Sequence, residues 1–351
     1  MESKTATEGS GVQRGVVLPG AIFALSFAIY AGSAVGAVLA GNMGWKIGLA
    51  VLSGTFIANL AIIGHDAVHR SFTRLRWLNR LIGTWAFLPA LHPYGRWEHH
   101  HNRVHHCYTA QLGVDNAYPP MTPDAYRAAS PARRLHYRFM RSLLGQPFFY
   151  MVDIWAIDMF LPFVRRRHGL RTSDWRDIAI VYSWLVLSTF GLAVLSWDLD
   201  GGSFRAALWN GGIYGVLIPF LVWNVFISFV TIVQHTGPRV RWVVPTGRFS
   251  THQERLGGTV HVVFPEALDW FFHRVMQHVV HHVNPIIPLY RLKHEEKKLL
   301  GGEPAPIVET WTPLYHWRMT RDCKLYDPAT KSWRRFPAAR GRFKDGAAAP
   351  A

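Results

Sequence analysis

Residues 16–40 (VVLPGAIFALSFAIYAGSAVGAVLA) decide the fold, because no charged side chain interrupts this long apolar stretch. A helix of about 20 apolar residues crosses the hydrocarbon core of a bilayer, which is about 30 Å thick. The stretch is longer than the apolar region of a cleaved signal peptide, which is about 7–15 residues. The sequence therefore predicts a membrane helix that the mature chain retains.

Three more uncharged stretches follow, and they predict three further membrane helices at 47–64, 178–197 and 206–234. The last one contains Gly211, Gly212 and Pro219, which are tolerated in membrane helices. Short connectors at 41–46 and 198–205 join the stretches in pairs. We therefore expect an all-α integral membrane protein with four transmembrane helices, arranged as two hairpins that enter the membrane from one side.

Composition agrees with a protein in which membrane helices and polar segments alternate. Charged residues make up 17% of the 351 residues, below the roughly 25% of soluble domains. The chain has 15 Trp, a residue enriched at membrane–water interfaces. Its mean hydropathy of +0.06 is too low for a chain that is nearly all membrane helix. With only two cysteines, Cys107 and Cys323, it is neither a disulfide-rich secreted domain nor a cysteine-based zinc module.

The net charge of +16 falls in the two polar segments that follow the hairpins. An excess of Lys and Arg marks the cytoplasmic side of a membrane protein, so we expect both segments and both termini in the cytoplasm. Four membrane helices exclude a soluble nucleic-acid-binding protein despite this charge. The expected organisation is a polar tail (1–15), a first hairpin (16–64), a first cap segment (65–177), a second hairpin (178–234), a second cap segment (235–340) and a disordered tail (341–351).

Residues 143–164 form another apolar run, which contains Asp153 and Asp158. Two carboxylates within a span are unfavourable in lipid, so we expect an interfacial helix here. The alternative is a fifth span, which would put residues 64–142 and the third histidine cluster on opposite faces of the membrane.

All 19 histidines lie in the two polar segments, and three clusters stand out. The first is HDAVH (65–69), the second is HHHNRVHH (99–106), and the third is QHVVHH (277–282). Histidines three or four residues apart share one face of a helix and can bind one metal ion together. The number of histidines exceeds the three or four ligands of one zinc site and fits two metal ions. Adjacent histidines point about 100° apart on a helix, so one pair can serve two ions.

Imidazole suits iron, copper, zinc and nickel, and these residues alone leave the choice of metal open. We expect the histidines outside the clusters to be ordinary solvated residues, with His273 considered separately: His92, His136, His168, His252, His261, His294 and His316.

The flanks of the clusters carry a family resemblance. HDAVHRSF (65–72), HNRVHH (101–106) and HVVHHVNPIIPLYRL (278–292) resemble the three histidine boxes of integral-membrane fatty acid desaturases. IPLYRL and the IVQHTGP stretch (232–238) are similar to the acyl-lipid delta-12 (omega-6) branch. The resemblance covers roughly residues 60–300, in order and spacing.

The resemblance implies iron ligands at the box positions and a ninth ligand in the QHT motif. The implied ligands are His65, His69, His101, His105, His106, His235, His278, His281 and His282. It also implies residues that orient the ligands, for which the candidates are Asp66, Asp115 and His273. The second box has three residues between its histidines, where two are commoner, so His99 or His100 could replace His101.

The implied activity is desaturation of an acyl chain at a diiron centre, with O₂ as co-substrate and no catalytic residues beyond the metal ligands. A fatty acyl lipid would be the substrate, and the enzyme would reside in a bacterial inner membrane. No HPGG haem motif, P-loop or dinucleotide-binding motif occurs in the sequence, so electrons would come from an external ferredoxin or cytochrome b5 with its reductase.

Two alternatives stay open at this point. The same site would suit a diiron hydroxylase, acetylenase or carotenoid ketolase, and HDAVH also resembles the first box of the ketolases. A non-catalytic membrane protein that binds haem or metal through paired histidines is the rival from another class.

Overall fold

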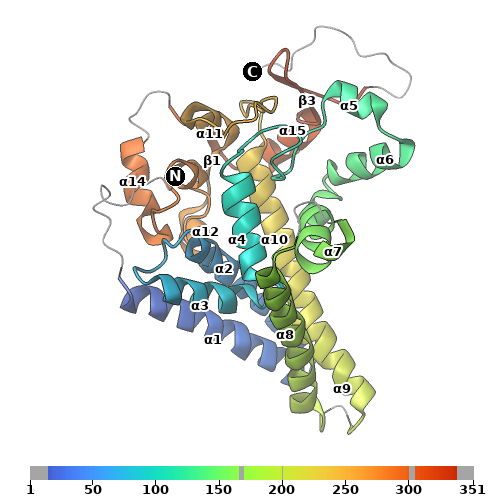
Figure 1. Ribbon diagram of the computed structural model, residues 1–351. Coiled ribbons are helices and arrows are strands. Elements are labelled where there is room, and N and C mark those ends of the chain that lie inside the picture. Colours follow the sequence, from blue (N-terminus) through green and yellow to red (C-terminus); the bar gives the residue numbers. More distant parts are fainter. Residues whose placement is uncertain (1–14, 166–169, 200, 300–304, 338–351) are drawn as a thin grey trace.

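The protein is described by a computed structural model that covers residues 15–165, 170–199, 201–299 and 305–337. The tail predicted at 341–351, and all but the last residue of the tail predicted at 1–15, lie outside these ranges. Helices make up most of the described residues, as predicted for the fold class, and they form a membrane region and a cap (Figure 1).

Four helices of the described residues are long and apolar enough to cross a membrane. They are α1 (Val17–Leu39), α2 (Met43–Val68), α8 (Thr172–Ser196) and a rod made of α9 (Phe204–Asn210), η4 (Gly211–Leu217) and α10 (Ile218–His235). All four predicted spans are therefore present. α2 and α8 extend beyond their apolar stretches, α2 into the first histidine box and α8 back to Thr172.

Close helix contacts hold the membrane region together. A Cβ atom at Gly54 of α2 would lie 2.5 Å from the carbonyl oxygen of Pro219 in α10, so only glycine permits this approach. Near the connectors, Asn210 Nδ2 donates to the Val38 carbonyl (2.9 Å) and Lys46 Nζ donates to Asn210 Oδ1 (2.8 Å). Three of the four helices are thus linked by side-chain hydrogen bonds where they meet the connectors.

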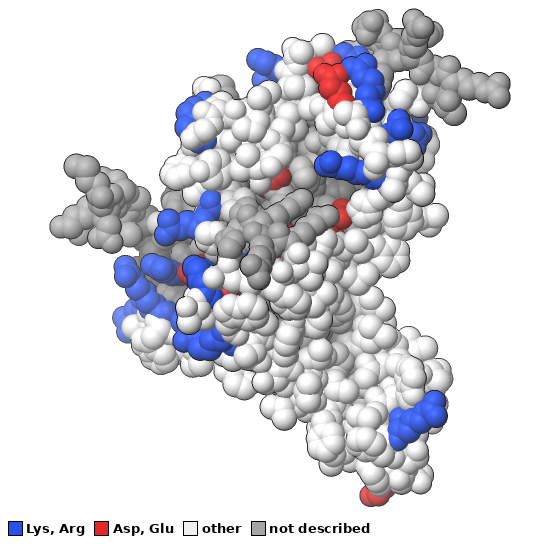
Figure 2. All heavy atoms as spheres, turned by 45° about the vertical axis from the view of Figure 1, so that its right-hand side comes forward, with Lys and Arg blue, Asp and Glu red and all other residues white. Residues whose placement is uncertain are grey.

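Exposed tryptophans mark both ends of the membrane helices, as expected for residues at the two lipid–water interfaces. Trp45, Trp197 and Trp209 lie near the connectors, and Trp77, Trp175 and Trp270 lie near the cap. The distribution of charge also separates the cap from the membrane region. In Figure 2 charged side chains gather on the cap, and the lower half of the molecule shows almost none above its tip.

The first cap segment consists of short helices. They are α3 (Arg76–Phe87), α4 (Tyr94–Glu98), η1 (His99–His105), α5 (Pro123–Ala128), α6 (Pro131–Met140), η2 (Gln146–Phe148), η3 (Tyr150–Phe160) and α7 (Pro162–Arg165). The run 143–164 is thus three short helices rather than the single interfacial helix expected, and none of them qualifies as a span. Pro147 and Pro162 each lie in the first turn of a new helix, where the missing N–H of proline is tolerated.

The second cap segment mixes helices with two small sheets. The helices are α11 (His252–Gly258), α12 (Glu266–Phe271), α13 (His278–Val283), η5 (Leu289–Arg291), α14 (Leu292–Leu299) and α15 (Pro313–Asp322). β1 (His261–Val263) pairs in parallel with β2 (Val308–Thr310), with His261 opposite Val308. β3 (Leu325–Asp327) pairs antiparallel with β4 (Ser332–Arg334), with Leu325 opposite Arg334. These two-stranded sheets are the departure from an all-α chain.

Candidate metal centre

Five imidazoles converge where α2 ends and the cap begins. His65 lies in the last turn of α2, and His69 is the C-cap residue of that helix. His101 lies in η1, His106 follows η1 directly, and His281 lies in α13. One possible ligand atom of each lies within 4.8 Å of those of all the others. We call this set group one: His65, His69, His101, His106 and His281.

Four more imidazoles form a second convergent set beside the first. They come from η1, from the last residue of α10 and from α13, and their ligand atoms also lie within 4.8 Å of one another. All four residues are buried. We call this set group two: His105, His235, His278 and His282. The nine histidines singled out in the sequence therefore fill two separate groups.

Adjacent histidines divide between the groups. His105 belongs to group two and His106 to group one, while His281 belongs to group one and His282 to group two. Successive residues on a helix point in different directions, which is why one short helix can serve both groups.

A π-helical turn accommodates the extra residue in the second box. His106 N donates to the His101 carbonyl (2.9 Å), a bond between residues five apart. This wider turn puts both side chains on one face, with their Nε2 atoms 3.0 Å apart. His99 and His100 belong to neither group. His99 lines a surface cleft, and His100 lines an apolar cavity.

The spacing of the nitrogens fits a metal-binding site. Two nitrogens bound at right angles to one ion, with bonds of about 2.1 Å, would lie about 3.0 Å apart. In group one His281 Nε2 lies 3.1 Å from His106 Nε2, and in group two His282 Nε2 lies 3.0 Å from His105 Nε2 and 2.9 Å from His278 Nε2. The nitrogens are too crowded for a porphyrin plane to lie between two of them, which argues against the haem alternative.

Burial disfavours the charged form of several of these imidazoles, and metal ligands must be uncharged. Burial first, and neighbouring imidazoles second, lower the pKa of His106, His281 and His282 well below the ordinary value. The same two causes lower the pKa of His278. Neutral rings that face one another present lone pairs that a cation can share.

Asp115 orients the ring of His105. Its Oδ1 lies 2.8 Å from His105 Nδ1 and also accepts from Ala117 N (3.0 Å), while its Oδ2 accepts from Ala110 N (2.7 Å). Although burial alone would raise the pKa of Asp115, the nearby imidazoles and these donors lower it below its ordinary value. The carboxylate therefore favours a proton on His105 Nδ1 and leaves Nε2 free to bind a metal.

The other two candidates for orienting a ligand differ from each other. Asp66 Oδ1 lies 3.7 Å from His65 Nδ1, and Asp66 Oδ2 accepts from Leu289 N (2.7 Å), so this residue joins the first box to the chain after the third. His273 lies outside both groups, where its Nε2 is 3.0 Å from Asn59 Oδ1 in α2.

Two residues that sequence reasoning missed also touch the histidines. Thr109 Oγ1 lies 3.2 Å from His282 Nδ1, and the Trp97 ring stacks on His101 at 4.3 Å between ring centroids. Trp97 precedes His101 by four residues on the continuous helix formed by α4 and η1. This spacing could have predicted that the two rings contact each other.

An apolar cavity reaches both groups from the membrane region. It holds about 860 Å³ of free space including its mouth. Ala61 of α2, Ile154 of η3, and Phe226 and Val230 of α10 contribute to its walls. Histidines of both groups also line it: His65, His101, His105, His235 and His278. The cavity can therefore bring an apolar chain against both candidate metal positions.

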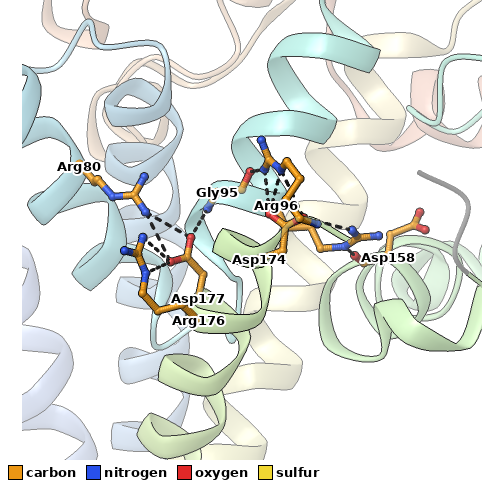
Figure 3. A network of polar contacts seen from close by, with 8 residues as sticks. Arg80, Gly95, Arg96, Asp158, Asp174, Arg176 and Asp177 are labelled. Atoms are coloured by element: carbon orange, nitrogen blue, oxygen red, sulfur yellow. Dashed lines mark hydrogen bonds and ion pairs between the residues drawn. The ribbon is translucent and has the colours of Figure 1, made fainter. Parts of the chain in front are cut away.

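A partly buried ionic network holds the helix that leads into the second box (Figure 3). Asp177, near the start of α8, accepts from Gly95 N (2.9 Å) and lies 3.5 Å from Arg80 Nη2. On the other side, Arg96 donates to the Asp158 carbonyl and lies 4.0 Å from Asp174. Because Gly95 and Arg96 belong to α4, which leads directly into η1, the network holds the second box against α8.

Comparison with known proteins identifies the chain. The family model described as fatty acid desaturase matches residues 43–313. This chain belongs to the fatty acid desaturase family. The desaturase is 30% identical over 296 residues to the sn-1 oleoyl-lipid 12-desaturase of a Synechocystis species, a match that covers 79% of this chain and 75% of that protein. It is 28% identical to the chloroplastic omega-6 fatty acid desaturase of Arabidopsis thaliana, a match that covers 78% of this chain and 58% of that protein.

These names confirm the likeness to the delta-12 (omega-6) branch, and the family makes the desaturase an oxidoreductase.

Of the histidines expected to be solvated, His252 and His294 are exposed and His136 is paired with Asp153 at the surface. The expectation was wrong for His92, which is 1% exposed and lies 2.9 Å from the Tyr150 hydroxyl, and for His261, which is buried beside Glu296. His316 is half-buried against Gln146, and His168 lies outside the described residues.

Proposed function

We propose that this desaturase introduces a double bond into an acyl chain of a membrane lipid, using two iron ions held by groups one and two. O₂ and two electrons from an external donor complete the reaction. The observation that carries the proposal is the apolar cavity, because its wall includes histidines of both groups.

The reaction explains why both the cavity and the histidines are needed. An unactivated –CH₂–CH₂– unit, O₂, two electrons and two protons become –CH=CH– and two waters. No acid or base breaks such C–H bonds, and bound iron with O₂ would supply the oxidant. The chain's own residues have three tasks: the imidazoles hold the ions, Asp115 keeps His105 in the required tautomer, and the cavity walls keep the methylene groups in place and water out.

The substrate proposed first is an oleoyl chain esterified to a membrane lipid. Its support is the similarity to the Synechocystis relative, an sn-1 oleoyl-lipid 12-desaturase. The position of the new double bond, counted from the carboxyl end, is the quantity to measure.

We propose that the cap and both termini face the cytoplasm of a bacterial cell, beneath its inner membrane. The excess of Lys and Arg in the cap supports this orientation. A reduced ferredoxin or cytochrome b5 would then reach the metal centre from the cytoplasm.

Expression in a host that makes oleate but no dienoic fatty acid tests the proposal. We expect a new diene in the lipid fraction by gas chromatography–mass spectrometry, and no diene with His281→Ala. His294→Ala is the control, because this side chain is 70% exposed in α14. A hydroxylated, acetylenic or ketolated product without the diene would favour the related oxidations, and full activity of His281→Ala would contradict the ligand assignment.

A further inference from the structure

A second opening leads to the histidines from the outer surface of the cap. This polar cleft lies between the end of α2, the α4–η1 rod and the chain that follows α13. His69 and His106 line it, and both belong to group one. Group two has no residue among the residues that line the cleft.

The cleft has a basic rim. Among the described residues, three arginines line it, Arg70, Arg103 and Arg171, against one acidic residue, Glu98. The side chains of Arg70 and Arg171 are 59% and 52% exposed, whereas that of Glu98 is 26% exposed and lies 4.0 Å from Arg70. Asp174 pairs with Arg171 at 2.8 Å, and the Gly95 carbonyl accepts from it at 2.8 Å. Arg171 is thus held in position. Because Glu98 and Asp174 each offset one arginine, the described part of the rim carries one net positive charge.

The two groups differ in how the outside reaches them. His65, His69 and His101 of group one are partly exposed, whereas every residue of group two is buried. Of these three, only His69 lines the polar cleft, while His65 and His101 line the apolar cavity. A carrier at the surface of the cap is therefore nearer to group one, and electron transfer slows steeply as distance grows.

We propose that the basic cleft is the docking site of an acidic one-electron carrier protein, and that electrons enter the centre through group one, at His69 and His106. The inference rests on the proposed function, which needs an external electron donor. Its support is charge complementarity, because a rim of three arginines attracts a carrier with an acidic face and steers its approach. No described residue lines both the cleft and the apolar cavity, so the carrier and the acyl chain would reach the centre by separate openings.

Binding of a carrier gives a readout that does not depend on turnover. The full chain in nanodiscs of neutral lipid is titrated with a plant-type [2Fe–2S] ferredoxin, which is acidic, at low ionic strength. We expect the double variant Arg70→Glu/Arg103→Glu to raise the Kd at least about tenfold. The matched control is Arg133→Glu, an exposed arginine in α6 that does not line the cleft. Added salt should weaken binding to the wild type and the control but have little effect on the double variant.

Turnover then separates docking from chemistry. With ferredoxin, its reductase and NADPH, the double variant should show a raised KM for ferredoxin, while turnover driven by dithionite with a mediator stays at the wild-type level. An unchanged Kd and KM in the double variant would overturn the docking site, as would equal losses in the Arg133→Glu control. Two results with the wild type would also overturn it. One is desaturation with NADPH in the absence of ferredoxin and its reductase, and the other is desaturation with dithionite but none with reduced ferredoxin. Absence of any desaturation by the wild type with dithionite would instead contradict the proposed function.

Discussion

Asp115 illustrates how a residue outside both histidine groups can fix the orientation of one of their rings. Its two oxygens accept two backbone N–H groups as well as the imidazole of His105, so neither the carboxylate nor the ring can rotate. A ring fixed in this way always presents the same nitrogen to the other members of group two.

Asp115→Asn should therefore weaken metal binding while the chain stays folded. The amide keeps the shape of the carboxylate but loses its charge, and its NH₂ group faces a backbone donor. We expect metal affinity to fall about 10–100-fold, measured as iron retained per chain against a series of chelator concentrations. Asp153→Asn is the control, because Asp153 pairs with His136 at the surface. Equal retention by the two variants would show that Asp115 does not act through His105.

His92 predicts a dependence of stability on pH that is separate from the metal centre. Burial lowers the pKa of His92 to about 4, whereas a histidine in the unfolded chain titrates near 6.5. Between these values the unfolded chain binds a proton that the folded chain does not. Folding stability is therefore complete above about pH 6.5 and decreases as the pH falls towards 4, by up to about 3 kcal/mol for this residue.

The variant His92→Gln should lose some of this dependence. We expect its Tm, followed by tryptophan fluorescence in detergent, to fall less between pH 7.5 and pH 5 than the Tm of the wild type. His294→Gln, at an exposed position, should behave like the wild type. Identical pH slopes in all three proteins would show that His92 becomes protonated in the folded state as readily as in the unfolded state.

The short helix α4 is the element on which the second box depends. Two residues of the ionic network hold its backbone. Gly95 N donates to the Asp177 carboxylate, and Arg171 donates to the Gly95 carbonyl. Both partners lie at the start of α8, a membrane helix. Contacts with the membrane helix α8 therefore help to position the second box, in addition to contacts within the cap.

Gly95→Ala should disturb this support. A Cβ atom there would lie 2.8 Å from Asp177 Oδ2, so the carboxylate must move away from Gly95 N and from Arg80. We expect destabilisation of about 1–3 kcal/mol, the cost of a disrupted buried polar group, seen as a lower Tm. Gly32→Ala in α1 is the matched control, because nothing lies within 4 Å of its Cβ position. Equal Tm values for the two variants would show that α4 adjusts without strain.

The existence of each membrane helix could be predicted from sequence, but its ends could not. α2 continues past residue 64 because the side chains of its last turn meet other histidines and the backbone of Leu289 rather than lipid. α8 begins at Thr172 because Asp174 and Asp177 find arginine partners, one of them Arg80 in α3. Such partners are distant in sequence, so composition and spacing within a segment do not reveal them.

The sequence could predict which histidines belong to the candidate site, but not how they divide between the two groups. On an α-helix His101 would share a face with His105, whereas the π-helical turn brings it beside His106. The nine histidines follow from spacing and family resemblance, and the structure gathers all of them. Thr109 and the basic cleft were missed, since their roles depend on contacts made across the chain.

At the scale of the whole molecule, the two polar segments form one cap. Each histidine group takes members from both segments, so the two segments must lie on the same side of the membrane. The connectors between the spans then lie on the other side, provided that each predicted span crosses.

Labelling with a membrane-impermeant maleimide tests the orientation. Asp198→Cys places a thiol in the connector after α8, and Arg133→Cys places one in the cap, both at exposed positions. In intact bacterial spheroplasts we expect label on Asp198→Cys only, and on both variants after permeabilisation. The wild type supplies the background, because Cys107 is half-buried and Cys323 is buried. Label on Arg133→Cys in intact spheroplasts would place the cap outside the cell.

The division of each histidine group between the two halves of the chain also constrains biogenesis. A ribosome-bound chain that has not yet reached residue 281 lacks at least one imidazole of both groups. Until then, the histidines of the first two boxes are only part of either group. The proposed ions would therefore bind both complete groups only after the second hairpin and residue 282 have been made, which places metal loading late in synthesis or after it.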